Sequence, residues 1–354
     1  MMATLRISGR VVIMKGGFAL GREASGMAAP TIERIGEHLF VNADCVRGAA
    51  AHLADGSVDL IVTDPPYGIE GDRLDRHYNR DERFVDDGYV EVDARKYASF
   101  SRAWVAQAER VLKPGGQLYV VSGYTNLYDV LGALRKTSLR EINHIIWKYN
   151  FGVYTSSKFV SSHYHILYYA KPGGRRRFNL QSRFALDETA ADGRSLNYRD
   201  REDVWSINRE YKPGRRKNKN ELPKALLKKI LAYSSKEGDL VCDFFLGGCS
   251  TAAVAIGMNR RFVGFEVSER TFRSRVPELR KIVPGSLIEA PPDPHVVRNR
   301  GKSWSLAELE QLHGRFRELQ ASGATRGAIV ATLSAELERG AWAIRKRLNS
   351  ARNS

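Results

Sequence analysis

A short apolar strand that runs into two prolines is the feature that most constrains the fold of this 354-residue chain. Val58–Thr63 is rich in β-branched and apolar residues, as expected of a strand buried in a parallel sheet. Pro65 and Pro66 cannot continue a hydrogen-bonded ladder, so the chain must leave the sheet there. Asp64 and Tyr67 are therefore predicted at the carboxyl end of the strand, where open α/β sheets bind ligands.

A second strand, later in the chain, opens into a glycine-rich turn. The strand and turn are predicted over Leu240 to Thr251, a helix over Ala252–Ile256, and the next strand over Phe262–Glu266. This is the layout of a Rossmann-type nucleotide site, in which an acid such as Glu266 binds ribose hydroxyls. The turn has no G-x-G-x-x-G pattern and no lysine after it, so a dinucleotide or a triphosphate fits it poorly.

The two motifs together resemble one enzyme family. Asp64-Pro65-Pro66-Tyr67 resembles motif IV of the DNA amino-methyltransferases, which methylate adenine N6 or cytosine N4. Leu240 to Thr251 resembles their cofactor motif I, with Phe244 in place of the usual proline. The catalytic motif comes first in the chain, as in the permuted β subgroup, and the resemblance covers roughly residues 39 to 283. It implies an α/β fold, a Rossmann-like methyltransferase sheet with helices on both faces.

The resemblance also implies the site residues. The catalytic set is Asp64, Pro65, Pro66 and Tyr67: the Asp64 carboxylate and the Pro65 carbonyl accept hydrogen bonds from the amino group, and Tyr67 stacks on a flipped base. S-adenosyl-L-methionine is the expected cofactor, and no metal is expected. The residues expected to bind the cofactor are Asp44, Asp64, Asn220, Glu221, Asp243, Phe244, Phe245, Gly247, Gly248, Ser250, Thr251 and Glu266.

Asp64 favours adenine N6 as the target, because cytosine-N4 enzymes of the family usually carry serine at that position. We therefore expect a site-specific DNA methyltransferase that acts on a flipped adenine. Two alternatives stay open: an N4-cytosine DNA methyltransferase, and a DNA-binding regulator with a decayed cofactor site.

The charge of the chain suits double-stranded DNA as a partner. Lys and Arg number 56 against 40 Asp and Glu, a formal net charge of +16. The densest basic stretch lies at about residues 172–218, where the subgroup carries its target-recognition insert. A solvated basic loop without specific contacts is the alternative. The residues of this stretch expected to bind DNA are Arg175, Arg176, Arg177, Arg215, Arg216 and Lys217.

The C-terminal part is predicted to be a separate all-α module. A proline-rich linker, residues 289–301, precedes Ser305, which stands at capping-box spacing from Glu308. Helices are predicted from there to about Gln320, over Thr325–Leu333 and over Trp342–Leu348. The module resembles helix-turn-helix or Myb-like DNA-binding domains, with Arg345 and Arg347 on its last helix. The alternative is a bundle that dimerises or braces the catalytic domain.

The predicted layout is a disordered leader (1–34), a catalytic domain (35–288), the linker and a module at 302–354. The three cysteines lack metal-ligand spacing and are expected to be reduced and buried. No apolar run reaches the length of a membrane span, so a cytoplasmic protein associated with DNA is expected. His163 and His165 are expected to pack rather than to catalyse, and a homodimer is left open.

Overall fold

The computed structural model describes residues 6–7, 10–11, 30–66, 92–150, 156–186, 188–210, 221–288, 299 and 302–350. The chain divides into two compact units. The first joins residues 1–179 with 203–288, and the second joins 180–202 with 289–354. The described helices include none that is long and apolar enough to cross a membrane.

Among the described residues of the first unit, nine strands form one mixed sheet, in the order β3-β4-β11-β10-β5-β6-β8-β7-β9. The central strands β4, β11, β10, β5 and β6 are parallel, and β8 runs antiparallel to β6 and β7. A separate ladder joins β1 and β2. The strands are β1 (Arg6–Ile7), β2 (Arg10–Val11), β3 (Thr31–Ile35), β4 (His38–Asn42), β5 (Val58–Thr63), β6 (Leu112–Ser122), β7 (Arg140–Lys148), β8 (His163–Ala170), β9 (Val204–Ser206), β10 (Leu240–Asp243) and β11 (Arg261–Glu266).

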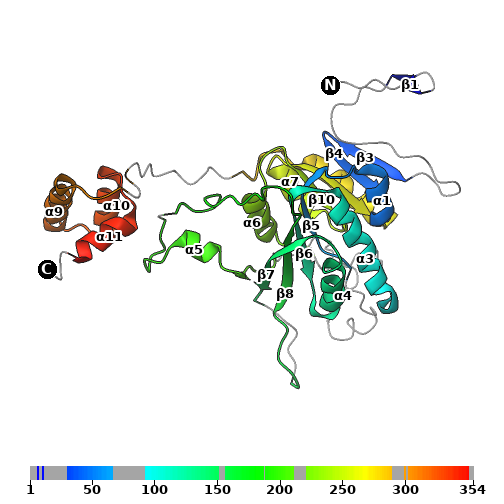
Figure 1. Cartoon of the computed structure of the whole chain (residues 1–354), viewed down its shortest axis with the longest axis horizontal. Coiled ribbons are helices and arrows are strands. Elements are labelled where there is room, and N and C mark those ends of the chain that lie inside the picture. The colour runs from blue at the N-terminus through cyan, green and yellow to red at the C-terminus, as the bar shows by residue number, and fades with distance from the viewer. Residues whose placement is uncertain are drawn as a thin grey trace. The chain divides into compact units, whose positions relative to one another are not determined.

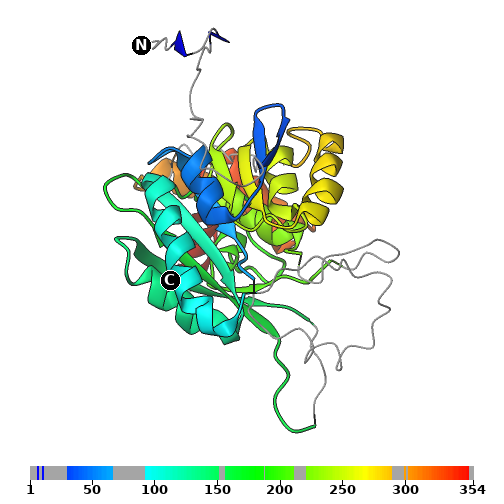
Figure 2. The same cartoon turned by 90° about the vertical axis from the view of Figure 1, so that its right-hand side faces the viewer.

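Helices cover both faces of the sheet (Figure 1, Figure 2). One face packs on α1 (Cys45–His52), α3 (Ala94–Val111) and α4 (Tyr124–Leu134). The other packs on α6 (Lys224–Ser234), α7 (Ser250–Gly257), α8 (Glu269–Arg275) and the 3-10 helix η2 (Val276–Lys281).

Strand β5 shows why the sheet needs both layers. Leu60 and Val62 lie in one core and Ile61 in the other, and all three are fully buried. The predicted Rossmann-like sheet and the predicted strand Val58–Thr63 are both confirmed. The sheet starts earlier than the expected boundary at residue 35, because Thr31–Ile35 pairs antiparallel with β4.

The second unit contains α5 (Leu196–Asp200), α9 (Leu306–Ala321), α10 (Arg326–Glu336) and α11 (Ala341–Ser350). The predicted capping box of Ser305 and Glu308 begins α9. Arg339 is only 3% exposed; it donates hydrogen bonds to Glu308 and lies over the Trp304 ring, 4.5 Å from its centroid. The buried core of the three C-terminal helices is Leu312, Ile329, Val330, Leu333, Leu337, Ile344 and Leu348.

The division into units differs from the predicted layout in one respect. Residues 180–202, expected to belong to the catalytic domain as part of the 172–218 insert, group with the C-terminal helices instead. Arg345 of α11 contributes to this grouping, because its guanidinium donates to the Gly193 carbonyl at 3.4 Å and to the Thr189 hydroxyl at 3.3 Å.

Candidate active site

The catalytic and cofactor motifs meet at the carboxyl ends of two neighbouring parallel strands. Strand β5 pairs with β10 through Leu60 and Val241 and through Ile61 and Cys242. Just beyond these pairs, the Thr63 hydroxyl donates a hydrogen bond of 2.8 Å to the Asp243 carboxylate. This buried bond joins the strand that precedes Asp64 to the strand that leads into the glycine turn.

Asp243 is the structural centre of this junction. Its Oδ1 atom also accepts a 3.0 Å hydrogen bond from the Phe245 N–H, and Thr251 donates to the same carboxylate. Burial raises the pKa of Asp243 to about 7, although the donors Phe245, Thr251 and Thr63 act in the opposite direction. Asp243 therefore holds the turn in place from inside the protein.

The glycine turn is fixed by Glu266 at the end of β11. The Gly247 N–H donates to one carboxylate oxygen at 2.9 Å, and the Ser268 N–H donates to the other at 2.8 Å. Burial raises the pKa of Glu266, whereas these backbone donors lower it. The acid expected to contact a ribose thus lies directly beside the turn.

Glu221 also reaches the turn. A Cβ atom on Gly248 would lie 2.6 Å from a Glu221 carboxylate oxygen, so a larger residue at this position would displace the Glu221 side chain. Asp44 follows β4 and caps α1, accepting hydrogen bonds from the Val46 and Arg47 N–H groups. The structure therefore brings Glu221 to the turn and places Asp44 at the same edge of the sheet.

The two phenylalanines of the turn differ. Phe244 is 1% exposed and packs on Trp104 and Phe265, so its ring belongs to the core. Phe245 is half-buried and contacts Phe100 and Trp104 of α3, with ring centroids 5.7 and 5.6 Å apart. Of the two rings, Phe245 is the one left partly accessible for a cofactor.

Sequence reasoning missed two residues that contact the catalytic motif. The Tyr97 hydroxyl donates to the Pro66 carbonyl at 2.7 Å, and the Asn126 amide donates to the same oxygen at 3.4 Å. Tyr97 lies on α3 and Asn126 on α4, and both are buried. Neither position stands out in the sequence, because the contacts depend on how the two helices pack.

Arg175, Arg176 and Arg177 lie at the opposite edge of the sheet from Asp64. They follow β8, which runs antiparallel to β6, so the chain here has returned to the start of β6. The close approach of the two segments is seen at Gly115, where a Cβ atom would lie 2.6 Å from the Arg175 carbonyl oxygen. Arg176 donates to the Tyr168 hydroxyl at 2.7 Å. The expected DNA contact of these arginines stays a prediction, but they do not converge with the catalytic motif.

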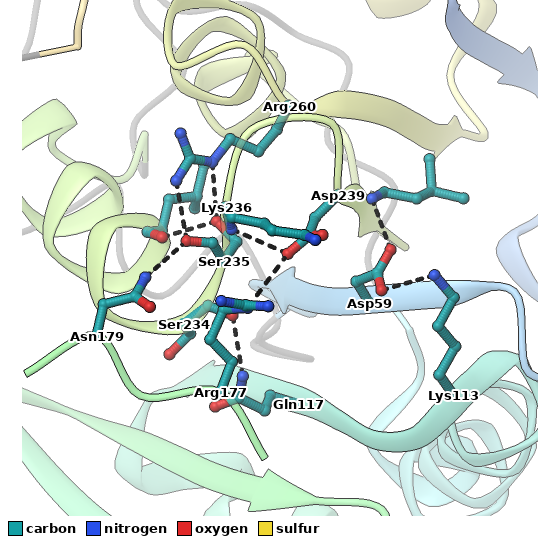
Figure 3. A network of polar contacts seen from close by, with 12 residues as sticks. Asp59, Lys113, Gln117, Arg177, Asn179, Ser234, Ser235, Lys236, Asp239 and Arg260 are labelled. Carbon is teal, nitrogen blue, oxygen red and sulfur yellow. Dashed lines mark hydrogen bonds and ion pairs between the residues drawn. The ribbon is translucent and has the colours of Figure 1, made fainter. Parts of the chain in front are cut away.

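A polar network surrounds this opposite edge (Figure 3). Arg177 points to Asp239, with an N–O separation of 3.8 Å, and Asn179 donates to the carbonyls of Ala232 and Ser235. Buried Arg260 donates to Ser235 as well. The network anchors the segment after β8 to the end of α6.

Five predicted site residues lie outside the described part of the chain: Tyr67, Asn220, Arg215, Arg216 and Lys217. Arg347 lies over the Trp304 ring within the second unit. All three cysteines are buried and free, as expected. Among the described residues, no group of three or more His, Cys, Asp or Glu could hold a metal ion.

The histidines of β7 and β8 pack together. His144 and His165 are joined by a hydrogen bond of 2.8 Å between ring nitrogens, and His163 packs edge-on against His165. Burial, with the neighbouring His144 and His163, lowers the pKa of His165 to about 4.

Comparisons with known proteins agree with this geometry. A family model described as DNA methylase matches residues 58–276. The type II methyltransferase M.HinfI of Haemophilus influenzae is 26% identical over 260 residues, 69% of each chain. M.HpaI of Haemophilus parainfluenzae is 26% identical over 224 residues, covering 62% of this chain and 68% of the relative.

Two solved structures share the fold. A DNA modification methylase of Thermus thermophilus, complexed with S-adenosyl-L-methionine, has a TM-score of 0.50 and 22% identity, over 68% of this chain and 93% of its own. The cytosine-N4-specific PvuII DNA methyltransferase has a TM-score of 0.52 and 13% identity, and the match covers 68% of this chain and 85% of that one. With the family model matching well over half of its residues, the chain belongs to the DNA methylase family.

Proposed function

We propose that the protein is a site-specific methyltransferase of the permuted β subgroup that methylates N6 of a flipped adenine in DNA. The observation that supports the proposal is the junction of β5 and β10, where Thr63, the residue before Asp64, donates a hydrogen bond to Asp243 at the start of the glycine turn. A reacting amino group and a methyl donor must lie in one place, and this junction supplies a site for each.

The cofactor is S-adenosyl-L-methionine, and the residues present fit it. The Gly248 backbone lies in a turn where a Cβ would displace the Glu221 carboxylate, and Glu266, the acid expected to bind the ribose, is held by two backbone donors. Glu221, Phe245 and Asp44 complete the set that would hold it. When bound, it supplies a methyl group on a positively charged sulfur.

The chain's own residues act on the amino group of the base. The Asp64 carboxylate and the Pro65 carbonyl accept hydrogen bonds from its two N–H groups, which favours a pyramidal nitrogen whose lone pair is free to attack. Asp64 can then take the proton that the methylated nitrogen releases. Most of the rate enhancement comes from positioning, for which preorganisation supplies about 7–11 kcal/mol. Extruding the base costs a few kcal/mol, and stacking on Tyr67 returns about 1–3 kcal/mol.

The first test identifies the product. The purified protein is incubated with unmethylated genomic DNA and the cofactor, and the digested nucleosides are analysed by mass spectrometry. N6-methyladenine is the expected product. N4-methylcytosine would overturn the argument from Asp64 while preserving the fold and the mechanism. Absence of any product, with no cofactor binding, would favour a DNA-binding regulator.

The second test isolates Asp64. Asp64→Asn is expected to lower the transfer rate at least about 100-fold, as when a preorganised polar group at a reacting centre is lost. DNA retention should stay within about twofold, because the change leaves the basic surfaces intact. Asp59→Asn is the matched control, since Asp59 lies at the other end of the same strand and contacts Lys113 and the Leu240 N–H. Equal rates in the two variants would exclude a catalytic role for Asp64.

We also propose that the C-terminal helices, residues 302–354, bind DNA in the manner of a helix-turn-helix or Myb-like module. Support comes from α11, which carries Arg345, Lys346 and Arg347 in succession. Deleting residues 300–354 should weaken DNA binding and leave cofactor affinity unchanged. Unchanged DNA affinity would assign the module a bracing role instead.

A further inference from the structure

The end of the catalytic motif is anchored through a carbonyl oxygen. Pro65 and Pro66 have no N–H groups, so this stretch cannot be fixed by donating backbone hydrogen bonds. The Pro66 oxygen instead accepts from the Tyr97 hydroxyl at 2.7 Å and from the Asn126 amide at 3.4 Å. These donors come from α3 and α4, which lie 31 and 60 residues further along the chain.

Both donors are held rigidly. Tyr97 is 1% exposed and Asn126 is 5% exposed, so neither side chain can exchange its bond for water without disturbing the core. Burial raises the pKa of the Tyr97 hydroxyl well above its usual range; a hydrogen bond with the Asn126 side chain lowers this pKa, and the Asp64 charge raises it. The hydroxyl therefore stays protonated, and remains a donor, across the pH range in which a DNA methylase works.

Tyr97 also connects the catalytic motif to the cofactor turn. Its ring packs edge-on against Phe100, with centroids 5.7 Å apart, and Phe100 packs against Phe245 at the same separation. Phe245 belongs to the glycine turn and donates its N–H to Asp243. A continuous run of contacts thus joins Pro66 to the turn through α3, in addition to the direct link between Thr63 and Asp243.

We propose that Tyr97 and Asn126 are positioning residues for methyl transfer: they set the direction of the Pro66 carbonyl, and with it the placement of Asp64 and Pro65 relative to the cofactor turn. The proposal rests on the proposed function. Its physical basis is that groups at a reacting centre must be held within a fraction of an ångström, so a loosened anchor lowers the rate more than it lowers binding.

The experiment compares Tyr97→Phe with Tyr119→Phe. Both changes remove one buried hydroxyl: that of Tyr97 donates to Pro66, whereas that of Tyr119 is bonded to the Ser234 hydroxyl at 2.7 Å. Single-turnover transfer to genomic DNA should fall about tenfold in Tyr97→Phe, equivalent to about 1.4 kcal/mol. This is close to the net value of one hydrogen bond. The Kd of Tyr97→Phe for the cofactor should stay within about twofold of the wild-type value. Tyr119→Phe should keep the wild-type rate within about twofold, although its Tm should fall about as much as that of Tyr97→Phe.

Asn126→Ala completes a double-mutant cycle. Tyr97 and Asn126 share one acceptor, so each single variant leaves the Pro66 oxygen with a donor, and the double variant removes both. The rate of the double variant should fall by more than the product of the single effects. Losses that simply multiply would contradict the shared-anchor role.

Hydrogen–deuterium exchange of the peptide spanning residues 60–68 provides a readout that does not depend on transfer. Exchange should be faster in Tyr97→Phe and unchanged in Tyr119→Phe. Equal transfer rates or equal exchange in the two variants would overturn the positioning role. A wild-type protein that transfers no methyl group to DNA, with the exchange difference present, would instead refute the proposed function and keep the anchor.

Discussion

Replacing Asp243 with asparagine should make the first unit more resistant to heat at pH 8 than the wild-type protein. Burial raises the pKa of this carboxyl from 3.8 to about 7. Between these two pH values the folded protein keeps a proton that the unfolded chain has lost. The stability that depends on this proton is present at low pH and is lost as the pH rises toward 7.

The size of the effect follows from the pKa difference. About two pH units of the range in which the folded protein keeps the proton lie above pH 5, and each unit changes the free energy of unfolding by about 1.4 kcal/mol. Between pH 5 and pH 8 the free energy of unfolding of the wild-type protein should therefore fall by about 3 kcal/mol relative to that of the variant. At roughly 2–4 °C per kcal/mol, this amounts to about 6–12 °C in Tm. The asparagine oxygen can still accept a hydrogen bond from Thr63 or Phe245.

The assay is calorimetry of both proteins at several pH values, with the difference in Tm plotted against pH. Other groups also titrate with folding. The raised pKa of Glu266 acts in the same direction as that of Asp243. The lowered pKa values of His165 (about 4), His38 and His52 make stability rise as the pH rises toward 6.5. These groups are present in both proteins and largely cancel in the difference. Parallel curves from pH 5 to pH 8 would refute the reasoning and show that Asp243 titrates normally.

Three further changes test other parts of the structure. Gly248→Ala should weaken cofactor binding about tenfold by displacing Glu221, whereas Gly132→Ala, in open space on α4, should leave cofactor binding unchanged; calorimetric titration measures both affinities. Arg176→Gln should lower Tm, because it removes the bond to the Tyr168 hydroxyl; DNA affinity that stays within about twofold would contradict the DNA contact expected from the sequence. Arg339→Ala should unfold the C-terminal helices, since a module of about 50 residues is only marginally stable, and loss of their far-ultraviolet dichroism would report it.

The features predicted well from the sequence are those set by local chemistry. Two consecutive prolines cannot continue the ladder of a central strand, so the carboxyl end of Val58–Thr63 agrees with the structure. The spacing of Ser305 and Glu308 similarly fixed the start of α9. The glycine turn was recognisable because a strand, a turn, a helix and a strand follow one another within a short segment.

The features that escaped prediction depend on strand direction and helix packing. The reversal of β8 brings Arg175–Arg177 to the opposite ends of the strands from Asp64, a placement that the composition of this segment did not indicate, while their expected DNA contact stays a prediction. Strand β3 is largely exposed, so it lacks the apolar signal that would have separated it from the expected leader. The contacts of Tyr97 and Asn126 with Pro66 join separate helices to a loop, and no local pattern encodes them.

The distance along the chain between β5 and β10 has a consequence for synthesis on the ribosome. Strand β5 can pair with β6 soon after it is made, but its other neighbour contains Asp243, 180 residues after Thr63. At about 5–20 residues per second, β10 is completed roughly 10–40 s later. During this interval the nascent chain presents an apolar strand with one open edge, a template for pairing with other chains. Chaperone protection of that edge should therefore govern the yield of folded enzyme.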